Sequence, residues 1–137
     1  MNGYYPSDPI AAWRAESNIQ AIGDVSDKFW EVIMIKDEAT KAPLQEAYLT
    51  KLLPFFFNIL TKRLHENGNK GHIVGDKMTV ADFANAAFAY SYILNERCVL
   101  GKPQEEVLDK YPTVKEYYLS LGEELRDYLK NRPENIY

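Results

Sequence analysis

Hydrophobic residues recur along most of the chain at steps of three and four, which is the spacing of one face of an α-helix. The first such stretch predicts a helix from Pro9 to about Lys36, with Asp8 before it as the N-cap and proline in its first turn. Trp30 and Met34 lie off the main apolar stripe, so they form either a second apolar face or a wider core. The stripe itself comprises Ala12, Ala15, Ile19, Ile22, Ser26, Phe29 and Ile33.

A second helical pattern spans about Pro43 to His65, after a polar break over residues 37–42. Pro54 lies inside this pattern and removes one backbone hydrogen bond, so we expect a kink or a restarted helix near residues 50–53. The three phenylalanines at 55–57 point in three directions, so at least one of them should face away from this chain's own core. The apolar positions with helical spacing are Tyr48, Leu49, Leu52, Phe56, Ile59, Leu60 and Leu64.

The most apolar stretch of the chain runs from Val80 to Leu94. A helix that is apolar on nearly all sides must be surrounded by protein, so this stretch predicts a buried central helix. Thr79 as N-cap and Asp82 three residues later predict a capping box, and Met78 with Phe83 predicts a hydrophobic staple. Only three residues of the stretch are polar: Asp82, Asn85 and Ser91.

Three shorter helices are expected after the central one, over about residues 104–110, 113–121 and 123–131, with Gly122 as a break or a bend between the last two. No stretch alternates with a period of two without also fitting a helix. The predicted fold class is therefore all-α, a bundle of helices around the buried, capped central helix. The positions expected to face inward are Val114, Tyr117, Tyr118, Leu121, Leu125, Tyr128 and Leu129.

Length and composition match one globular domain with one core: 137 residues, of which 46% are hydrophobic and 26% charged. The net charge of −4 and the lack of a Lys/Arg cluster argue against binding to nucleic acid. A single cysteine rules out an internal disulfide, and the N-terminus does not have the pattern of a signal peptide, so a cytoplasmic location is expected. The apolar run over residues 80–94 is too short for a membrane span.

The residues that most often carry chemistry do not form a convincing site. His65 and His72 are seven apart and have no third ligand nearby, so no metal site is expected. Arg97 beside Cys98 can lower the pKa of that thiol, but a structural role is the simpler interpretation. The glutamate pairs at 105–106 and 123–124 fall in first turns of predicted helices, where the helix dipole favours acids. We therefore predict no catalytic residue in this chain.

Four local features together resemble the C-terminal helical domain of cytosolic glutathione transferases. The feature around the capping box is the most specific of the four, because this capping box follows Ile73-Val74-Gly75-Asp76 and begins an apolar helix. The resemblance covers essentially the whole chain and implies a linker remnant at residues 1–7 and the helical domain at 8–137. The features are Tyr4-Tyr5-Pro6-Ser7-Asp8-Pro9; Leu53-Pro54; Ile73-Val74-Gly75-Asp76 with Thr79-x-x-Asp82-Phe83; and Tyr111-Pro112-Thr113-Val114 followed by Tyr128-Leu129 and Arg132-Pro133.

The resemblance also implies what the chain does not carry. In the family a thioredoxin-like domain precedes the helical one, holds most of the glutathione site and supplies the catalytic Tyr, Ser or Cys. That domain is absent from this sequence. We therefore expect the chain alone to be inactive.

By resemblance, three residues of the first helix belong to a binding site. Asp24 stands where an acidic residue often reaches the glutathione ammonium bound by the other subunit of a homodimer, although a solvated helix residue is the alternative. Trp30 and Met34 stand where the first helix walls the pocket for the hydrophobic electrophile, and core or interdomain contact is their alternative. Glutathione would be the co-substrate, and no metal is implied.

A second function is compatible with the same sequence. Related helical domains act as non-catalytic scaffolds in elongation-factor and tRNA-synthetase complexes. The off-stripe aromatic residues Trp13, Trp30 and the phenylalanines at 55–57 suit both functions, because an electrophile pocket and a protein interface each need an apolar outer face.

Overall fold

Helices make up most of the residues described in the computed structural model, which covers residues 3–133. No strand occurs within that range, so the predicted all-α class is confirmed. Two residues of the predicted linker (1–2) and four of the predicted domain (134–137) lie outside the described residues. The elements in order are α1 (Pro9–Met34), α2 (Glu38–Ala47), the π-helical η1 (Tyr48–Leu52), α3 (Leu53–Glu66), α4 (Val80–Phe88), the π-helical η2 (Ala89–Ile93), α5 (Gly101–Leu108), α6 (Pro112–Glu124) and α7 (Arg126–Asn131).

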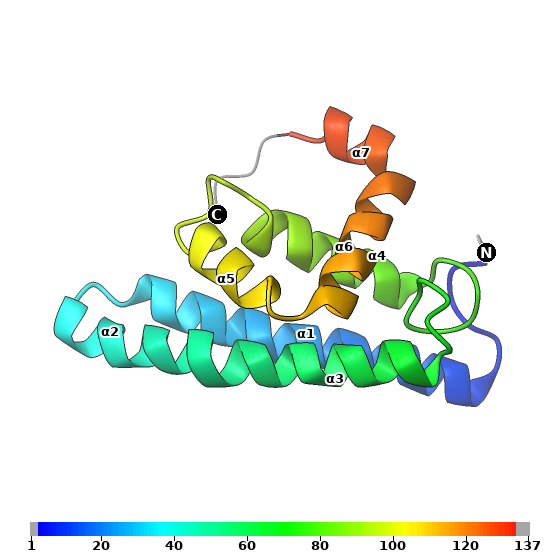
Figure 1. Ribbon diagram of the computed structural model, residues 1–137, viewed down its shortest axis with the longest axis horizontal. Coiled ribbons are helices and arrows are strands. Elements are labelled where there is room, and N and C mark those ends of the chain that lie inside the picture. The colour runs from blue at the N-terminus through cyan, green and yellow to red at the C-terminus, as the bar shows by residue number, and fades with distance from the viewer. Residues whose placement is uncertain (1–2, 134–137) are drawn as a thin grey trace.

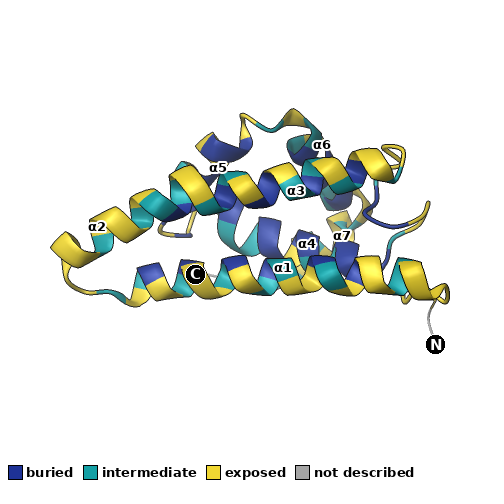
Figure 2. Cartoon of the chain, turned by 90° about the horizontal axis from the view of Figure 1, so that it is seen from below, coloured by how far each residue is buried: buried dark blue, intermediate teal, exposed yellow. Residues whose placement is uncertain are grey.

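The helices form two layers (Figure 1). In the lower layer α1 runs beside the continuous rod of α2, η1 and α3, which returns antiparallel to it. In the upper layer α4, α5 and α6 cover one face of this pair, and α7 lies farthest from it. Figure 2 shows the lower layer from its outer side, where exposed residues dominate α1 and α3, with the buried residues turned towards the upper layer.

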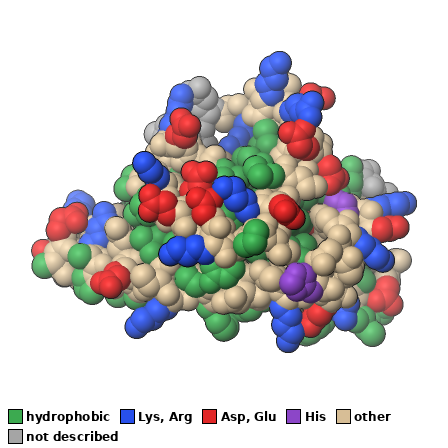
Figure 3. Space-filling view, viewed as in Figure 1, with side chains coloured by type: hydrophobic (Ala, Val, Ile, Leu, Met, Phe, Trp, Pro, Cys, Tyr) green, Lys and Arg blue, Asp and Glu red, His purple; other side chains and the backbone are tan. Residues whose placement is uncertain are grey.

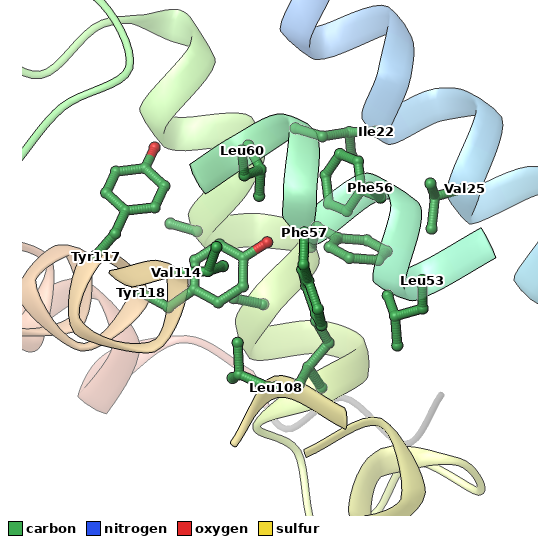
Figure 4. Close-up of a cluster of buried hydrophobic side chains, with 14 of the residues drawn as sticks. Ile22, Val25, Leu53, Phe56, Phe57, Leu60, Leu108, Val114, Tyr117 and Tyr118 are labelled. Carbon is green, nitrogen blue, oxygen red and sulfur yellow. The ribbon is translucent and has the colours of Figure 1, made fainter. Parts of the chain in front are cut away.

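The core lies between the two layers and takes side chains from both (Figure 4). Phe56, Phe57 and Leu60 of α3 are at most 1% exposed and meet residues of α1 and α6. Tyr118 of α6 is fully buried, and its ring centroid lies 6.4 Å from that of Phe57. The central helix α4 packs on α1 below and α6 above, as expected for a helix apolar on nearly all sides.

Helix α1 ends at Met34, two residues before the predicted end. Its N-cap is confirmed, because Oδ2 of Asp8 accepts a hydrogen bond of 2.8 Å from the backbone N–H of Ala11. The predicted stripe was partly wrong: Ile19 is 37% exposed, whereas Asn18 is fully buried. A polar side chain takes the core position because it has a partner on α4. The buried residues are Ala15, Asn18, Ile22, Val25, Phe29 and Val32.

The break between the first two helices falls at residues 35–37, earlier and shorter than the predicted 37–42, because α2 already begins at Glu38. Asp37 is the N-cap: its Oδ2 accepts from the backbone N–H and the hydroxyl of Thr40, at 2.9 Å and 2.6 Å. Pro43 therefore lies inside the helix rather than at its start. The irregularity expected before Pro54 is present as the π-helical turn η1. Proline cannot donate to the carbonyl four residues earlier, and a π-turn accommodates that gap.

The predicted central helix is also divided, since α4 ends at Phe88 and a π-helical turn, η2, completes it. Beyond it, α5 begins at Gly101, three residues earlier than expected. Of the break or bend expected at Gly122, the break was wrong, because α6 continues through this residue to Glu124. The hydroxyl of Tyr90 occupies the space that a side chain at position 122 would need, and this close approach explains the glycine.

The inward positions predicted on α6 are confirmed, but the last helix is more exposed than expected. Val114, Tyr117, Tyr118 and Leu121 are all buried. Tyr128 on α7 is 66% exposed, so its predicted inward position was wrong. Phe55 is 63% exposed, which confirms that one of the three consecutive phenylalanines faces away from the core.

Candidate functional site

The three predicted site residues all lie on α1 but not on one face of it. Trp30 and Met34 are one helical turn apart and share a face. Asp24 lies about 9 Å away along the axis and about 120° around the helix from Trp30. Asp24 is exposed, Trp30 is half-buried and Met34 is 72% exposed. The structure therefore brings Trp30 and Met34 together and places Asp24 on a different surface.

The side chain of Trp30 packs against an aromatic cluster formed with Phe29 and Tyr92. Its ring centroid lies 5.6 Å from that of Phe29 and 6.1 Å from that of Tyr92, both edge-to-face. The indole Nε1 donates a hydrogen bond of 3.3 Å to the hydroxyl of Tyr92. Phe29 and Tyr92 are themselves 4.8 Å apart between centroids. These contacts fix the orientation of the indole while leaving part of its surface open.

Behind Tyr92, a buried polar bridge connects the two π-helical turns. The hydroxyl of Tyr48 in η1 donates a 2.8 Å hydrogen bond to Oε1 of Gln104, and Nε2 of Gln104 donates a 2.9 Å hydrogen bond to the carbonyl of Tyr92 in η2. Gln104 is fully buried and Tyr48 is 2% exposed. Burial raises the pKa of Tyr48, so its hydroxyl stays protonated and remains a donor.

The predicted capping residues form a second buried polar cluster, at the N-terminus of α4. The capping box between Thr79 and Asp82 is present. Oδ2 of Asp82 accepts from the backbone N–H and the hydroxyl of Thr79, at 2.8 Å and 2.9 Å. Oδ1 accepts from the backbone N–H of Ile73 at 3.0 Å and from the hydroxyl of Tyr117 at 2.8 Å. Four donors thus satisfy a fully buried carboxylate.

This cluster has the properties of a structural element rather than a reactive one. Asp82 is 0% exposed, so no substrate can reach it. The ring of His72 lies nearby, with Nδ1 3.9 Å from Oδ1 of Asp82 and Nε2 3.7 Å from Oε1 of Glu124. Asn67 closes the loop before α4 through its side chain, which bonds the backbone of His72 and Gly75. The cluster joins that loop, α4 and α6.

The other chemistry-bearing residues remain apart. Burial raises the pKa of the Cys98 thiol, which makes it a poor nucleophile. Within residues 3–133, no group of three or more His, Cys, Asp or Glu side chains is placed to hold a metal ion. No helix in the described part of the chain has the length and apolar character needed to cross a membrane.

Surface hollows border both layers. One of about 590 Å³ lies between the second half of α1 and α2, η1 and α3, with Val32 and Tyr48 at its floor. Another of about 670 Å³ lies between α4 and α7, beside Phe83 and Leu129. Figure 3 shows hydrophobic side chains exposed between charged groups of both signs, with no extended field of one charge. This pattern favours apolar ligands or protein partners over nucleic acid.

Sequence analysis missed the residues that support Trp30. Tyr48 was predicted only as an apolar helix position, and Gln104 only as the start of a short helix. Tyr92 lay in the run over residues 80–94 and was counted among its apolar positions. Their hydrogen bonds span 56 and 12 residues along the chain. The sequence did indicate that tyrosine hydroxyls within apolar stretches need hydrogen-bond partners. It did not indicate which residues those partners are.

Comparisons with known proteins agree with this architecture. A family profile described as the glutathione S-transferase C-terminal domain matches residues 23–132. Prostaglandin synthase D of Nilaparvata lugens is similar with a TM-score of 0.78 and 19% identity, over 96% of this chain and 62% of that one. Monomeric Na-GST-3, a glutathione S-transferase of the hookworm Necator americanus, gives 0.77 and 23%, over 98% and 64%. The chain thus spans less than two thirds of either structure. A search of curated proteins found no match.

Proposed function

Because the chain belongs to the glutathione S-transferase C-terminal domain family, we propose that it is the helical half of a glutathione transferase. In this proposal it walls the pocket for a hydrophobic electrophile, and glutathione is the co-substrate of the complete enzyme. The pairing of half-buried Trp30 with exposed Met34, one turn apart on α1, carries the proposal. A cytoplasmic location and a role in detoxification belong to the same proposal.

Two properties of this surface suit an electrophile pocket. The indole of Trp30 offers a flat apolar face whose orientation is fixed by Phe29 and Tyr92. Met34 is unbranched and polarizable, so it adapts to ligands of different shape. A rigid wall beside an adaptable one fits an enzyme that accepts varied hydrophobic substrates. No carboxylate or other nucleophile is needed on this wall, because the catalytic group belongs to the thioredoxin-like domain in the proposed enzyme.

Asp24 is proposed to bind glutathione held by a partner subunit. Its position around α1 separates it from Trp30 and Met34, so it does not serve the same pocket. An exposed carboxylate can pair with the glutathione ammonium and fix the orientation of the peptide. In the enzyme with its thioredoxin-like domain, Asp24→Ala should weaken glutathione binding about fivefold, the upper range for an exposed ion pair. Asp27→Ala is the matched control, and equal effects of the two changes would remove Asp24 from the site.

A homodimer is proposed through the outer face of α1 and α3. Ile10, Trp13 and Phe55 are each more than 60% exposed on these helices. Exposed apolar side chains of this size favour a protein contact. One solved relative is described as monomeric, so the oligomeric state needs a direct measurement. Sedimentation velocity should show a dimer that Trp13→Glu dissociates, whereas Tyr128→Glu on α7 should have no effect.

The scaffold function is the second candidate, and the same exposed residues favour it. An assay with glutathione and chlorodinitrobenzene distinguishes the transferase function from the scaffold function. The chain alone should give no turnover above the uncatalysed rate, because the catalytic group of the proposed enzyme belongs to the thioredoxin-like domain. The longer protein, with a thioredoxin-like domain, should turn over. Turnover by the chain alone would contradict our assignment of the catalytic group, and an inactive longer protein would favour the scaffold.

A further inference from the structure

The buried side chain of Gln104 connects η1 and η2 behind Trp30, and we propose that Gln104 is a positioning residue of the electrophile pocket. The inference rests on the proposed function, because it concerns the pocket wall that Trp30 forms. Gln104 is 0% exposed, so it contacts no substrate and acts on Trp30 through Tyr92. The determinants of the pocket then extend beyond α1 to a residue of α5.

The C-terminal end of the central helix takes several of its hydrogen bonds from side chains. The last carbonyls of a helix have no donor within the helix. In η2, three successive carbonyls each accept a hydrogen bond from a side chain. The pairs are Arg132 with the carbonyl of Tyr90 at 2.6 Å, Asn95 with that of Ser91 at 3.0 Å and Gln104 with that of Tyr92 at 2.9 Å. Gln104 is the one buried donor of the three, and it serves the residue that contacts Trp30.

The amide of Gln104 has one favourable orientation. Its Oε1 accepts a 2.8 Å hydrogen bond from the hydroxyl of Tyr48 in η1, while its Nε2 donates to the carbonyl of Tyr92 in η2. Burial raises the pKa of Tyr48, so that hydroxyl remains a donor. A reversed amide would place its oxygen against the Tyr92 carbonyl, and two acceptors repel one another. Gln104 therefore fixes the backbone of Tyr92 relative to η1.

Tyr92 transmits this restraint to the indole of Trp30. The ring of Tyr92 lies between those of Phe29 and Phe88, at centroid distances of 4.8 Å and 5.5 Å. Its hydroxyl accepts the 3.3 Å hydrogen bond from Nε1 of Trp30. A shift of the Tyr92 backbone therefore moves both the acceptor and a ring that the indole packs against. A ligand would then have to order the indole itself, which corresponds to about threefold to tenfold weaker binding.

The chemical shift of the Trp30 indole proton tests the positioning directly. Trp13→Phe leaves Trp30 as the only tryptophan, so its indole N–H gives one nuclear magnetic resonance signal. Gln104→Met keeps the size of the side chain but removes its polar atoms, and it should move this signal. Tyr92→Phe should move it too. Tyr90→Phe is the same change in the same π-turn and should not move it, because that hydroxyl donates to α6. Circular dichroism checks that each variant is folded.

Gln104→Glu separates hydrogen bonding from packing. A protonated carboxyl at this position can donate to the Tyr92 carbonyl and accept from Tyr48, as the amide does, whereas the ionised form only accepts. Burial favours the protonated form, so this variant should match the parent at about pH 6 and approach Gln104→Met as the pH rises to about 8. The neighbouring Tyr48 and Cys98 stay uncharged over this range, because burial raises the pKa of both. The signal of the parent should stay constant.

Titration with chlorodinitrobenzene, followed by Trp30 fluorescence, connects the positioning to the pocket. Gln104→Met and Tyr92→Phe should bind about threefold to tenfold more weakly than the parent, and Tyr90→Phe should bind like it. An unmoved indole signal or unchanged binding in Gln104→Met would overturn the inference, as would no recovery by Gln104→Glu at about pH 6. If the indole signal moves as expected but the parent binds no chlorodinitrobenzene, the hydrogen-bonded restraint on Trp30 is supported and the proposed electrophile pocket is contradicted.

Discussion

The hydroxyl of Tyr117 donates a hydrogen bond of 2.8 Å to Oδ1 of Asp82, and the two residues are 3% and 0% exposed. This contact fastens α6 to the N-terminus of the central helix. The same carboxylate bonds Thr79 and Ile73, so one side chain holds three segments together. The cluster is the structural centre of the fold, and the surfaces proposed for binding lie elsewhere.

Removing the carboxylate should destabilise the protein strongly. Asp82→Ala leaves four buried donors without their acceptor, so we expect a loss of about 3 kcal/mol or more in the free energy of unfolding. Thr79→Ala should cost about 1 kcal/mol, the usual effect of losing an N-cap. Urea unfolding measures both. Asp76→Ala, an exposed position in the preceding loop, is the control, and an Asp82→Ala protein as stable as this control would disprove the role of the cluster.

Stability should fall at alkaline pH because of Tyr117. Burial and the neighbouring Asp82 raise the pKa of Tyr117 well above its ordinary value near 10. The folded state therefore keeps a proton that the unfolded state releases, so the stabilisation is complete below pH about 10 and declines as the pH rises further. Urea midpoints measured across that range should fall less steeply for Tyr117→Phe. Identical slopes for the two proteins would contradict this assignment.

Alanine should have opposite effects at two helical glycines. At Gly122 a Cβ atom would overlap with the Tyr90 hydroxyl, so Gly122→Ala forces a shift and should destabilise by about 1–3 kcal/mol. At Gly23, within α1, a Cβ atom meets open space, so Gly23→Ala should stabilise by about 0.5–1 kcal/mol through helix propensity. Thermal unfolding compares the two, and stabilisation by Gly122→Ala would refute the close contact with Tyr90.

Cys98 should react slowly with alkylating reagents. The thiol is buried, and that burial raises its pKa, so little thiolate forms at neutral pH and the reagent has little access. Mass spectrometry of iodoacetamide-treated protein should show far slower modification in buffer than in urea. Equal rates in the two conditions would place Cys98 in a reactive environment.

The elements that could be predicted from the sequence are those fixed by neighbouring residues. Asp8 with Pro9, and Thr79 with Asp82, are local signals, and the helices that they begin are where they were expected. Asp37 with Thr40 is an equally local cap, but the polar segment after it was interpreted as a break. The helix was therefore expected to begin at about Pro43 instead of Glu38.

The remaining features depend on contacts between distant residues. Asn18 takes a core position because Asn85, 67 residues away, donates to it. Position 122 of α6 is a glycine because Tyr90 occupies the space that a side chain there would need, and the two π-turns meet through Gln104. No pattern within one helix identifies these partners. For the same reason sequence analysis selected Trp30 but not Tyr92 and Gln104, which hold it in place.

Titration of Trp30 with a hydrophobic electrophile tests the proposed function most directly. In the Trp13→Phe protein, chlorodinitrobenzene should quench Trp30 along a saturable curve, because the aromatic ring binds between the indole and Met34. Met34→Leu should preserve the curve, and Met34→Glu should abolish its saturation. Linear quenching in the parent protein, or the same curve in Met34→Glu, would contradict the account that α1 walls an electrophile pocket.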